Sequence, residues 1–215
     1  NLPRLEGVAN DVQAMRQLAL TLGVHPSKIT VLSDTESGSA SPTLGTIQTS
    51  LHTLEETATA NTQLLIYLSG HGARQPIQTN AKAAGNEFDG LDEIFLAADA
   101  QPFSIAERTT PGALTDNMLA EVLQRLARKG VHVWLIVDSC NAGTMTRGAH
   151  DDDADANLFT VVGKRGASPD AIGVPLSITW QRLAARGKRL QRKLSTLFPS
   201  AEKQQTIASQ WPNVT

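Results

Sequence analysis

Cysteine is nearly absent from this sequence, since Cys140 is the only one among 215 residues. An internal disulfide is therefore excluded, which favours a reducing compartment, and we expect a cytoplasmic protein. Long apolar runs are absent too, so no membrane-spanning segment and no membrane partner are expected. Neither sign of charge is in excess, with 19 Lys and Arg against 21 Asp and Glu, and this balance does not indicate a nucleic-acid partner. Because the chain begins at Asn1, we expect any leader segment to have been removed or to lie outside it.

The apolar residues that are present, 40% of the total, suffice for one substantial core and a single α/β domain. Two short apolar runs, 64–68 and 131–137, indicate strands buried on both faces, which is typical of a parallel sheet. Apolar residues at helical spacing predict helices between strands, as in a doubly wound sheet. In chain order we expect a helix from Leu5 to Leu22, a strand from Ile29 to Leu32, a helix from Leu44 to Leu54, the strand 64–68, a loop over 73–92, a strand near 93–96, a helix capped by Thr115 or Asp116, and the strand 131–137.

Each of the two apolar runs leads into small polar residues and then into a reactive side chain. The first leads to His71, which has a glycine on each side, and the second leads to Cys140. Ligands bind at the carboxyl ends of strands in open α/β sheets, so both side chains stand where catalytic residues are expected. A thiol with an ordinary pKa of about 8.5 is mostly protonated at neutral pH and needs a nearby base or cation to act as a nucleophile. A lone cysteine is more often a core residue, but the two strand ends together favour a Cys–His pair.

Four segments resemble the motifs of caspase-like cysteine peptidases, most closely the metacaspases and their bacterial relatives, the orthocaspases. L-S-G-H-G at 68–72 and D-S-C-N-A-G at 138–143 look like the catalytic motifs, 6–12 is similar to the G-C-x-N-D-A stretch, and 89–93 is similar to D-G-x-D-E. The Q-A-C-x-G context of true caspases is absent. The resemblance covers residues 1–147 and implies a caspase-like sandwich, a mostly parallel central sheet flanked by helices, here as the large catalytic portion. The small portion is not recognisable in this chain, and we expect it as a separate chain or outside this sequence.

The resemblance implies a cysteine endopeptidase acting on proteins or peptides. Cys140 would attack the scissile carbonyl, His71 would assist as base and acid, and the backbone N–H groups of Gly72 and Cys140 would form the oxyanion hole. An acidic pocket for Arg or Lys before the scissile bond is implied at three residues: Asp11, Ser69 and Asp138. A strand-end capping role for Asp138 and a helix-start role for Asp11 are the structural alternatives. The other histidines lack the setting of His71 and are interpreted as structural or surface residues: His25, His52, His132 and His150.

Beyond the catalytic region we expect an acidic, Gly-containing loop over 148–175 and a basic helical segment over 176–215. The acidic residues in 150–155 are more simply explained as part of a solvated surface than as a metal site. The basic segment is more simply an exposed helix than a binding site for an acidic partner or anionic lipid. A peptidase that cleaves after basic residues could also cleave its own chain in this loop region. Self-processing is therefore predicted at Arg147, Lys164 or Arg165. The alternative is that these basic residues only keep the loop soluble.

Calcium dependence is expected to be weak or absent. In the family that the motifs resemble, activating calcium is bound by acids, and Asp92 and Asp116 match two of the positions. Thr115 and Arg147 stand where further acids are expected, and a cation at a site for a hard ion should remove most of its affinity. No other metal or cofactor is predicted.

Two alternatives remain open at this point. A catalytically silent caspase-like interaction module would be expected to lose Cys140 or His71, yet both are retained. Another Cys–His peptidase of the same clan, separase-like or legumain-like, would share the pair but not the Asn10–Asp11 segment. Labelling by a peptidyl electrophile separates an enzyme from a silent module.

Overall fold

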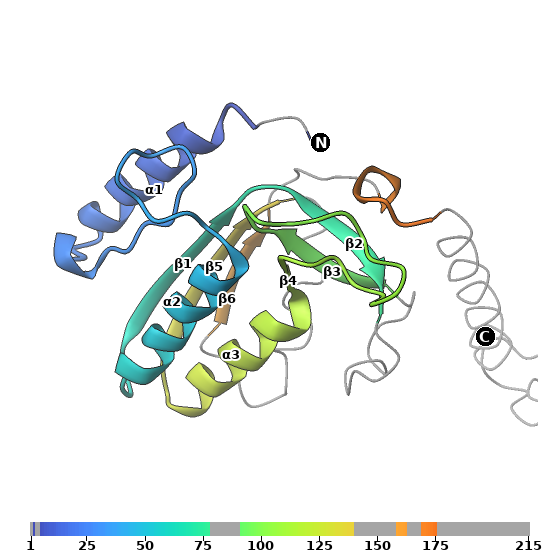
Figure 1. Cartoon of the computed structure of the whole chain (residues 1–215). Helices are drawn as coiled ribbons and strands as arrows, with labels where there is room; N and C mark the ends of the chain where they lie inside the picture. Colours follow the sequence, from blue (N-terminus) through green and yellow to red (C-terminus); the bar gives the residue numbers. More distant parts are fainter. Residues whose placement is uncertain (1, 3–4, 78–90, 140–157, 163–168, 176–215) are drawn as a thin grey trace, which may run out of the picture.

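The computed structural model describes residues 2, 5–77, 91–139, 158–162 and 169–175 (Figure 1). Among these residues the strands form two three-stranded sheets. The elements in chain order are α1 (Val8–Thr21), the 3-10 turn η1 (Pro26–Lys28), α2 (Leu44–Thr57), β1 (Gln63–Ser69), β2 (Gly72–Pro76), β3 (Leu91–Leu96), β4 (Ala113–Thr115), α3 (Asp116–Arg128), β5 (His132–Asp138), β6 (Leu158–Val162) and the 3-10 turn η5 (Pro169–Ile172).

The larger sheet is parallel, in the order β1-β5-β6, as the sequence predicts. The smaller sheet is antiparallel, in the order β2-β3-β4. Helices α2 and α3 lie side by side over one face of the parallel sheet, whereas α1 lies apart from this pair and contacts β1 (Figure 1). The two sheets are joined where β1 leads through two residues into β2. This junction contains the predicted catalytic histidine.

The core lies between the helix pair and the parallel sheet. Leu51 of α2 and Leu123 of α3 pack there against Val133, Leu135 and Val137 of β5. Side chains on the other face of β5 are only half-buried, because successive residues of a strand point to opposite faces. The expectation that both strands are buried on both faces is therefore wrong for the described part of the chain, in which alternate residues of β5 are buried and only Ile66 of β1 is.

Threonine side chains cap the starts of α2 and α3. Thr43 and Thr115 precede α2 and α3, and their hydroxyl groups accept hydrogen bonds from the backbone N–H groups of Thr46 and Met118, both at 3.2 Å. Such caps satisfy N–H groups that have no partner within the helix. Of the two cap candidates for α3, the structure therefore selects Thr115, and Asp116 becomes the first residue of the helix.

Three expectations about local structure are wrong. The segment 29–32 is not a strand; it has only an isolated bridge between Leu32 and Ala40, because no neighbouring strand extends the pairing. The start of the expected loop 73–92 is the strand β2, which is stabilised by pairing with the distant β3. The expected loop over 148–175 contains β6, whose backbone continues the parallel sheet beyond β5, and the turn η5.

No helix within the described ranges is both long enough and apolar enough to cross a membrane. The predicted acidic stretch 150–155 and the predicted basic helix from 176 onward lie outside the described residues.

Candidate active site

The ends of β1 and β5 lie next to each other. The two strands run parallel with Ser69 opposite Asp138, the last residue of each. Just beyond, the backbone N–H of Gly70 donates to the carbonyl of Asp138 at 3.3 Å. Ser69 and Asp138 are both half-buried. Two of the three residues predicted for the substrate pocket are thus brought together at the carboxyl edge of the parallel sheet.

His71 leaves the sheet at this same edge. It is half-buried and lies between the end of β1 and the first residue of β2, Gly72. Its backbone carbonyl accepts a hydrogen bond from the N–H of Leu96 on β3, at 2.9 Å. Gly72 itself is buried and pairs with Phe95 in the antiparallel ladder. The backbone on either side of and at the histidine is therefore hydrogen-bonded to both sheets, through Gly70 to the parallel one and through His71 to the antiparallel one.

Cys140 lies outside the described residues, as do the predicted processing sites Arg147, Lys164 and Arg165. Its chain neighbour Ser139 is described and is fully buried, with 0% of its surface exposed. Because β1 and β5 are parallel and in register, the segments that follow them start from the same edge of the sheet. His71 and Cys140 are each the second residue after their strand, which is the relation the sequence predicts.

Asp11, the third residue predicted for the pocket, lies in the first turn of α1 and is half-buried. Its backbone N–H donates to the carbonyl of Gly7 at 3.1 Å, so the residue is part of the helix start. A carboxylate is stabilised there by the positive end of the helix dipole. Figure 1 shows the start of α1 on the side toward which β1 ends.

Buried acids form a second cluster where the small sheet meets α3. Asp92, Glu93 and Asp116 are all buried, Asp116 with 4% of its surface exposed. Burial, and then the negative charge of Asp92, raise the pKa of Asp116 to about 7, with a smaller contribution from Glu93. Backbone N–H groups of Asn117 and Glu93 oppose the rise in pKa, the first by a 2.8 Å bond to the Asp116 carboxylate.

The two predicted calcium residues are thus close in space. The side-chain amide of Asn117 donates a hydrogen bond to the Asp92 carboxylate at 3.4 Å. The backbone N–H of the same residue donates to the Asp116 carboxylate, so Asn117 links the two acids. Thr115, at a position where a further acid is expected, uses its hydroxyl to cap α3. In the part of the chain that the structure describes, no group of three or more His, Cys, Asp or Glu side chains is arranged to hold a metal ion. The donor set therefore does not fit a complete site within the described residues.

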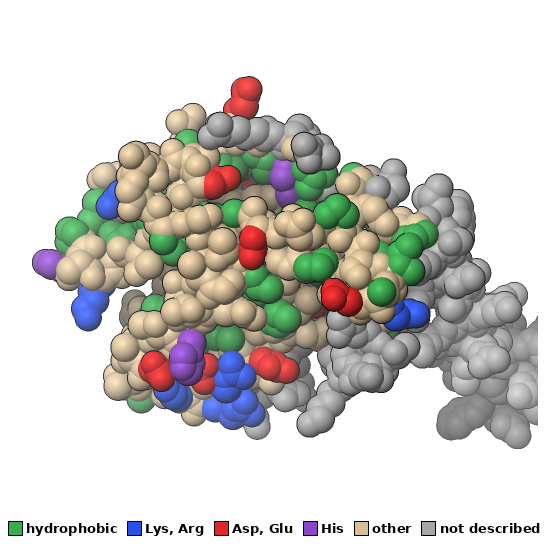
Figure 2. All heavy atoms as spheres, viewed as in Figure 1, with side chains coloured by type: hydrophobic (Ala, Val, Ile, Leu, Met, Phe, Trp, Pro, Cys, Tyr) green, Lys and Arg blue, Asp and Glu red, His purple; other side chains and the backbone are tan. Residues whose placement is uncertain are grey.

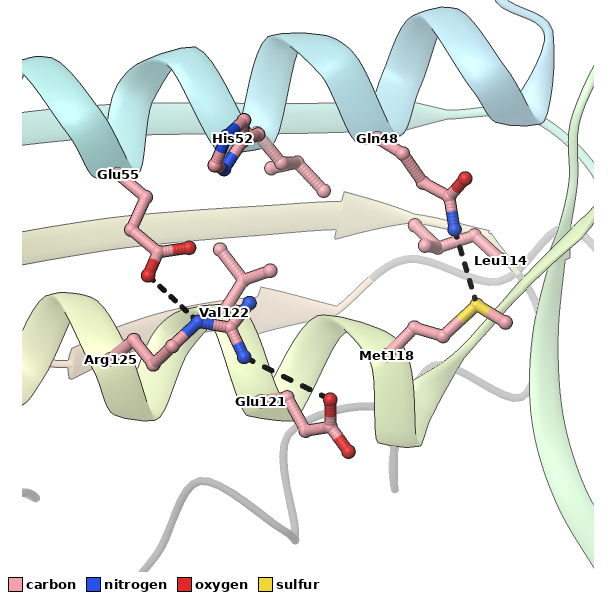
Figure 3. A pocket seen from close by; sticks show the side chains of 9 residues that line it. Gln48, His52, Glu55, Leu114, Met118, Glu121, Val122 and Arg125 are labelled. Atoms are coloured by element: carbon pink, nitrogen blue, oxygen red, sulfur yellow. Dashed lines mark hydrogen bonds and ion pairs between the residues drawn. The ribbon is translucent and has the colours of Figure 1, made fainter.

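A surface hollow lies elsewhere, between α2 and α3 (Figure 3). Arg125 crosses it, with its Nε 2.8 Å from Glu55 and its Nη1 3.8 Å from Glu121. Figure 2 shows charged side chains gathered over this part of the molecule. None of the predicted site residues lines the hollow, so it is separate from the strand ends.

A comparison with known families identifies the family of this chain. The family model described as "Metacaspase, peptidase C14 domain" matches residues 2–147. This chain belongs to the metacaspase family. The match covers the predicted catalytic region and every predicted pocket residue.

Individual metacaspases are distant relatives of this one. Metacaspase-1B of Neosartorya fischeri is 27% identical over 206 residues, which cover 88% of this chain and 47% of that protein. Metacaspase-4 of Arabidopsis thaliana is 31% identical over 141 residues, which cover 65% of this chain and 30% of that protein. The chain thus spans less than half the length of these two metacaspases. Protein GSU0716 of Geobacter sulfurreducens, a solved structure, aligns at 22% identity with a TM-score of 0.46 over 85% of this chain and 55% of that one.

Two features near the site of this metacaspase were not predicted. Glu93 completes the buried acid cluster, and the ring of Phe95 lies against Gly70, beside the histidine. The only signal in the sequence for the second was the glycine before His71.

Proposed function

We propose that this chain carries the catalytic portion of a cysteine endopeptidase in which His71 and Cys140 form the reacting pair. The observation that supports it most is the register of β1 and β5, with Ser69 opposite Asp138, since it starts both predicted catalytic segments from one edge. Membership of the metacaspase family supports the same reaction class. The single cysteine favours a reducing compartment for this enzyme, and we propose the cytoplasm.

The proposed reaction proceeds through a thioester. His71 takes the thiol proton as Cys140 attacks the scissile carbonyl carbon, and the proton then passes to the leaving amine as the C–N bond breaks. Water, deprotonated by the histidine, hydrolyses the thioester and regenerates the thiol. The backbone N–H groups of Gly72 and Cys140 are proposed to stabilise the oxyanion in both steps. The strands and cleft residues of the small portion are proposed to come from another chain or from the remainder of a longer protein.

Active-site labelling tests whether the chain is an active peptidase or a catalytically silent interaction module. A peptidyl fluoromethyl ketone ending in Arg should add the mass of one inhibitor less HF to the folded wild-type protein, because the Cys140 sulfur displaces fluoride as it forms the thioether. Cys140→Ala is the matched control and should stay unmodified. An unmodified wild type that also cuts no peptide from a diverse library would favour the silent module. Labelling by a probe ending in Asn instead would favour a legumain-like enzyme.

Specificity for Arg or Lys before the scissile bond is the next prediction. Ser69 and Asp138 lie side by side and half-buried, and a carboxylate there suits the paired N–H groups of a guanidinium. Asp138→Asn should lower kcat/KM for an Arg substrate by about 10- to 100-fold, the value of a hydrogen bond to a charged group. A substrate with citrulline in place of Arg has the same shape without the charge and should be affected far less. Preferred cleavage after Asp would refute the pocket, as would equal losses on both substrates.

Calcium should activate this enzyme weakly or not at all. Of the predicted calcium positions only Asp92 and Asp116 are acids, and the Thr115 hydroxyl is used in the α3 cap, so we expect no more than about twofold activation at sub-millimolar calcium. The measurement is peptide hydrolysis after treatment with a chelator, followed by titration with calcium. Strong activation that disappears in Asp92→Ala would contradict this prediction.

Self-cleavage is proposed at Arg147, Lys164 or Arg165. A pocket that accepts basic residues makes the chain a substrate of its own active site, provided that such residues are accessible. Wild type should acquire new termini at these positions, seen by mass spectrometry, whereas Cys140→Ala should stay intact. Equal, uncut chains in both, under conditions where a peptide is hydrolysed, would exclude self-cleavage as a requirement for activity.

A further inference from the structure

Gly70 lies between the last residue of β1 and His71, and lack of space is what requires a glycine there. Its φ is not among the positive values that favour glycine in this chain. A Cβ atom at this position would lie 2.9 Å from Cζ and 3.0 Å from Cε2 of Phe95. Real Cβ atoms are essentially never this close to another heavy atom, so any larger residue must move either the ring or the turn.

The Phe95 ring has little room to move. Phe95 is 6% exposed and belongs to the core between the helix pair and the sheets, together with Leu114 and Leu119. Interiors are packed densely, and displacing an aromatic ring means moving its neighbours too. A side chain added at position 70 is therefore expected to shift the turn that carries His71.

Strand β3 holds this turn at three successive residues. The ring of Phe95 covers Gly70, the backbone of Phe95 pairs with Gly72, and the N–H of Leu96 donates to the His71 carbonyl at 2.9 Å. From the other side, the carbonyl of Asp138 accepts from the Gly70 N–H. The turn is thus enclosed between β3 and β5, the strand that leads to Cys140.

We propose that Phe95 is a positioning residue for His71, whose ring against Gly70 sets the place of the imidazole relative to the end of β5. The inference rests on the proposed His71–Cys140 pair. A base must lie within hydrogen-bond reach of the proton it takes, and a displacement of about 1 Å can cost roughly 100-fold in rate. Phe95 does not touch the reacting atoms, so it acts only through the turn.

Steric rescue tests the proposal. Gly70→Ala should lower kcat by roughly 10- to 100-fold with little change in KM, because the base is displaced while the substrate pocket is intact. Phe95→Leu should cause a smaller loss. In the double variant the smaller side chain makes room for the new methyl group, so activity should recover to near that of Phe95→Leu, a clear departure from additivity. Phe103→Leu is the matched control, since it removes the same ring from a buried position in the second core cluster.

A second readout does not depend on turnover. The imidazole of His71, followed by NMR in the full chain labelled at histidine nitrogen, should change its chemical shifts in Gly70→Ala and Phe95→Leu and return toward wild type in the double variant. Phe103→Leu should leave them unchanged. If Gly70→Ala does not fold, the rescue is tested on the double variant, which should fold and should show His71 signals close to those of the wild type.

The possible failures are distinguishable. A wild type that neither hydrolyses peptides nor reacts at Cys140 would refute the proposed function, while rescue of the His71 signals would still support the positioning. Unchanged His71 signals in both single variants, or equal changes in Phe103→Leu, would overturn the positioning role whatever the activity. Additive losses in the double variant would overturn it as well.

Discussion

Cys140→Ala and His71→Ala should each lower kcat/KM for peptide hydrolysis by roughly four orders of magnitude or more, because water at the same place can replace neither the proposed nucleophile nor its proposed base. The free energy of unfolding should change little by comparison. His71 is half-buried at a turn whose backbone contacts do not involve its side chain, so its truncation should cost about 1 kcal/mol. Steady-state kinetics and thermal unfolding measure the two effects.

His52→Ala is the control for this experiment. His52 lies on the exposed surface of α2, with its Nε2 3.1 Å from Oε1 of Glu56, and it is not part of the candidate site at the strand ends. Its removal should leave hydrolysis unchanged within experimental error. A Cys140→Ala variant that retained most of its rate would show that the proposed nucleophile is wrong. Loss of folding in both Cys140→Ala and His71→Ala would favour structural roles for these residues.

Asp116→Asn should make the protein more stable at neutral pH in the presence of a chelator. The folded state raises the pKa of Asp116 from 3.8 to about 7, so between these values the folded protein holds a proton that the unfolded chain has released. The free energy of unfolding of the wild type therefore falls as the pH rises through this window and levels off above it. At 1.36 kcal/mol for each pKa unit, the difference at pH 8 is at most about 4 kcal/mol.

The asparagine keeps the shape of the protonated acid and an oxygen for the Asn117 N–H, yet it cannot ionise. Urea unfolding at pH 4 to 8 measures the effect, and the two proteins should converge near pH 4. Asp34→Asn, on the exposed surface, is the matched control and should leave the pH dependence unchanged. A wild type whose stability rises with pH relative to Asp116→Asn would contradict the burial argument.

The strands that lead to the candidate site were predictable because their signal is local. An apolar run followed by small residues marks the end of β1 and of β5, and the parallel pairing of β1 with β5 confirms the predicted sheet. By contrast, β2 was predicted as a loop. It contains Gly72 and Pro76, which disfavour strands, and it is stabilised by its partner β3, which no local pattern indicates.

The environment of the site depends on distant residues and could not be predicted in the same way. Asp92 and Asp116 were predicted as incomplete calcium ligands from motif positions, but the raised pKa of Asp116 follows from burial that only the fold creates. Gly70 was visible in the sequence, whereas the ring that requires it comes from β3. Cys140 and the processing sites stay predictions, since they lie outside the described residues.

The pairing of β1 with β5 also affects when the candidate site can form during synthesis of the chain. Gln63 pairs with His132, about 70 positions further along the chain, so closing the sheet means ordering a long intervening stretch and is expected to be slow. The turn that carries His71 leaves the ribosome long before the strand that leads to Cys140. A nascent or prematurely terminated chain that lacks β5 therefore presents the histidine without the proposed nucleophile, and under the proposed mechanism it cannot cleave its neighbours until the late pairing is made.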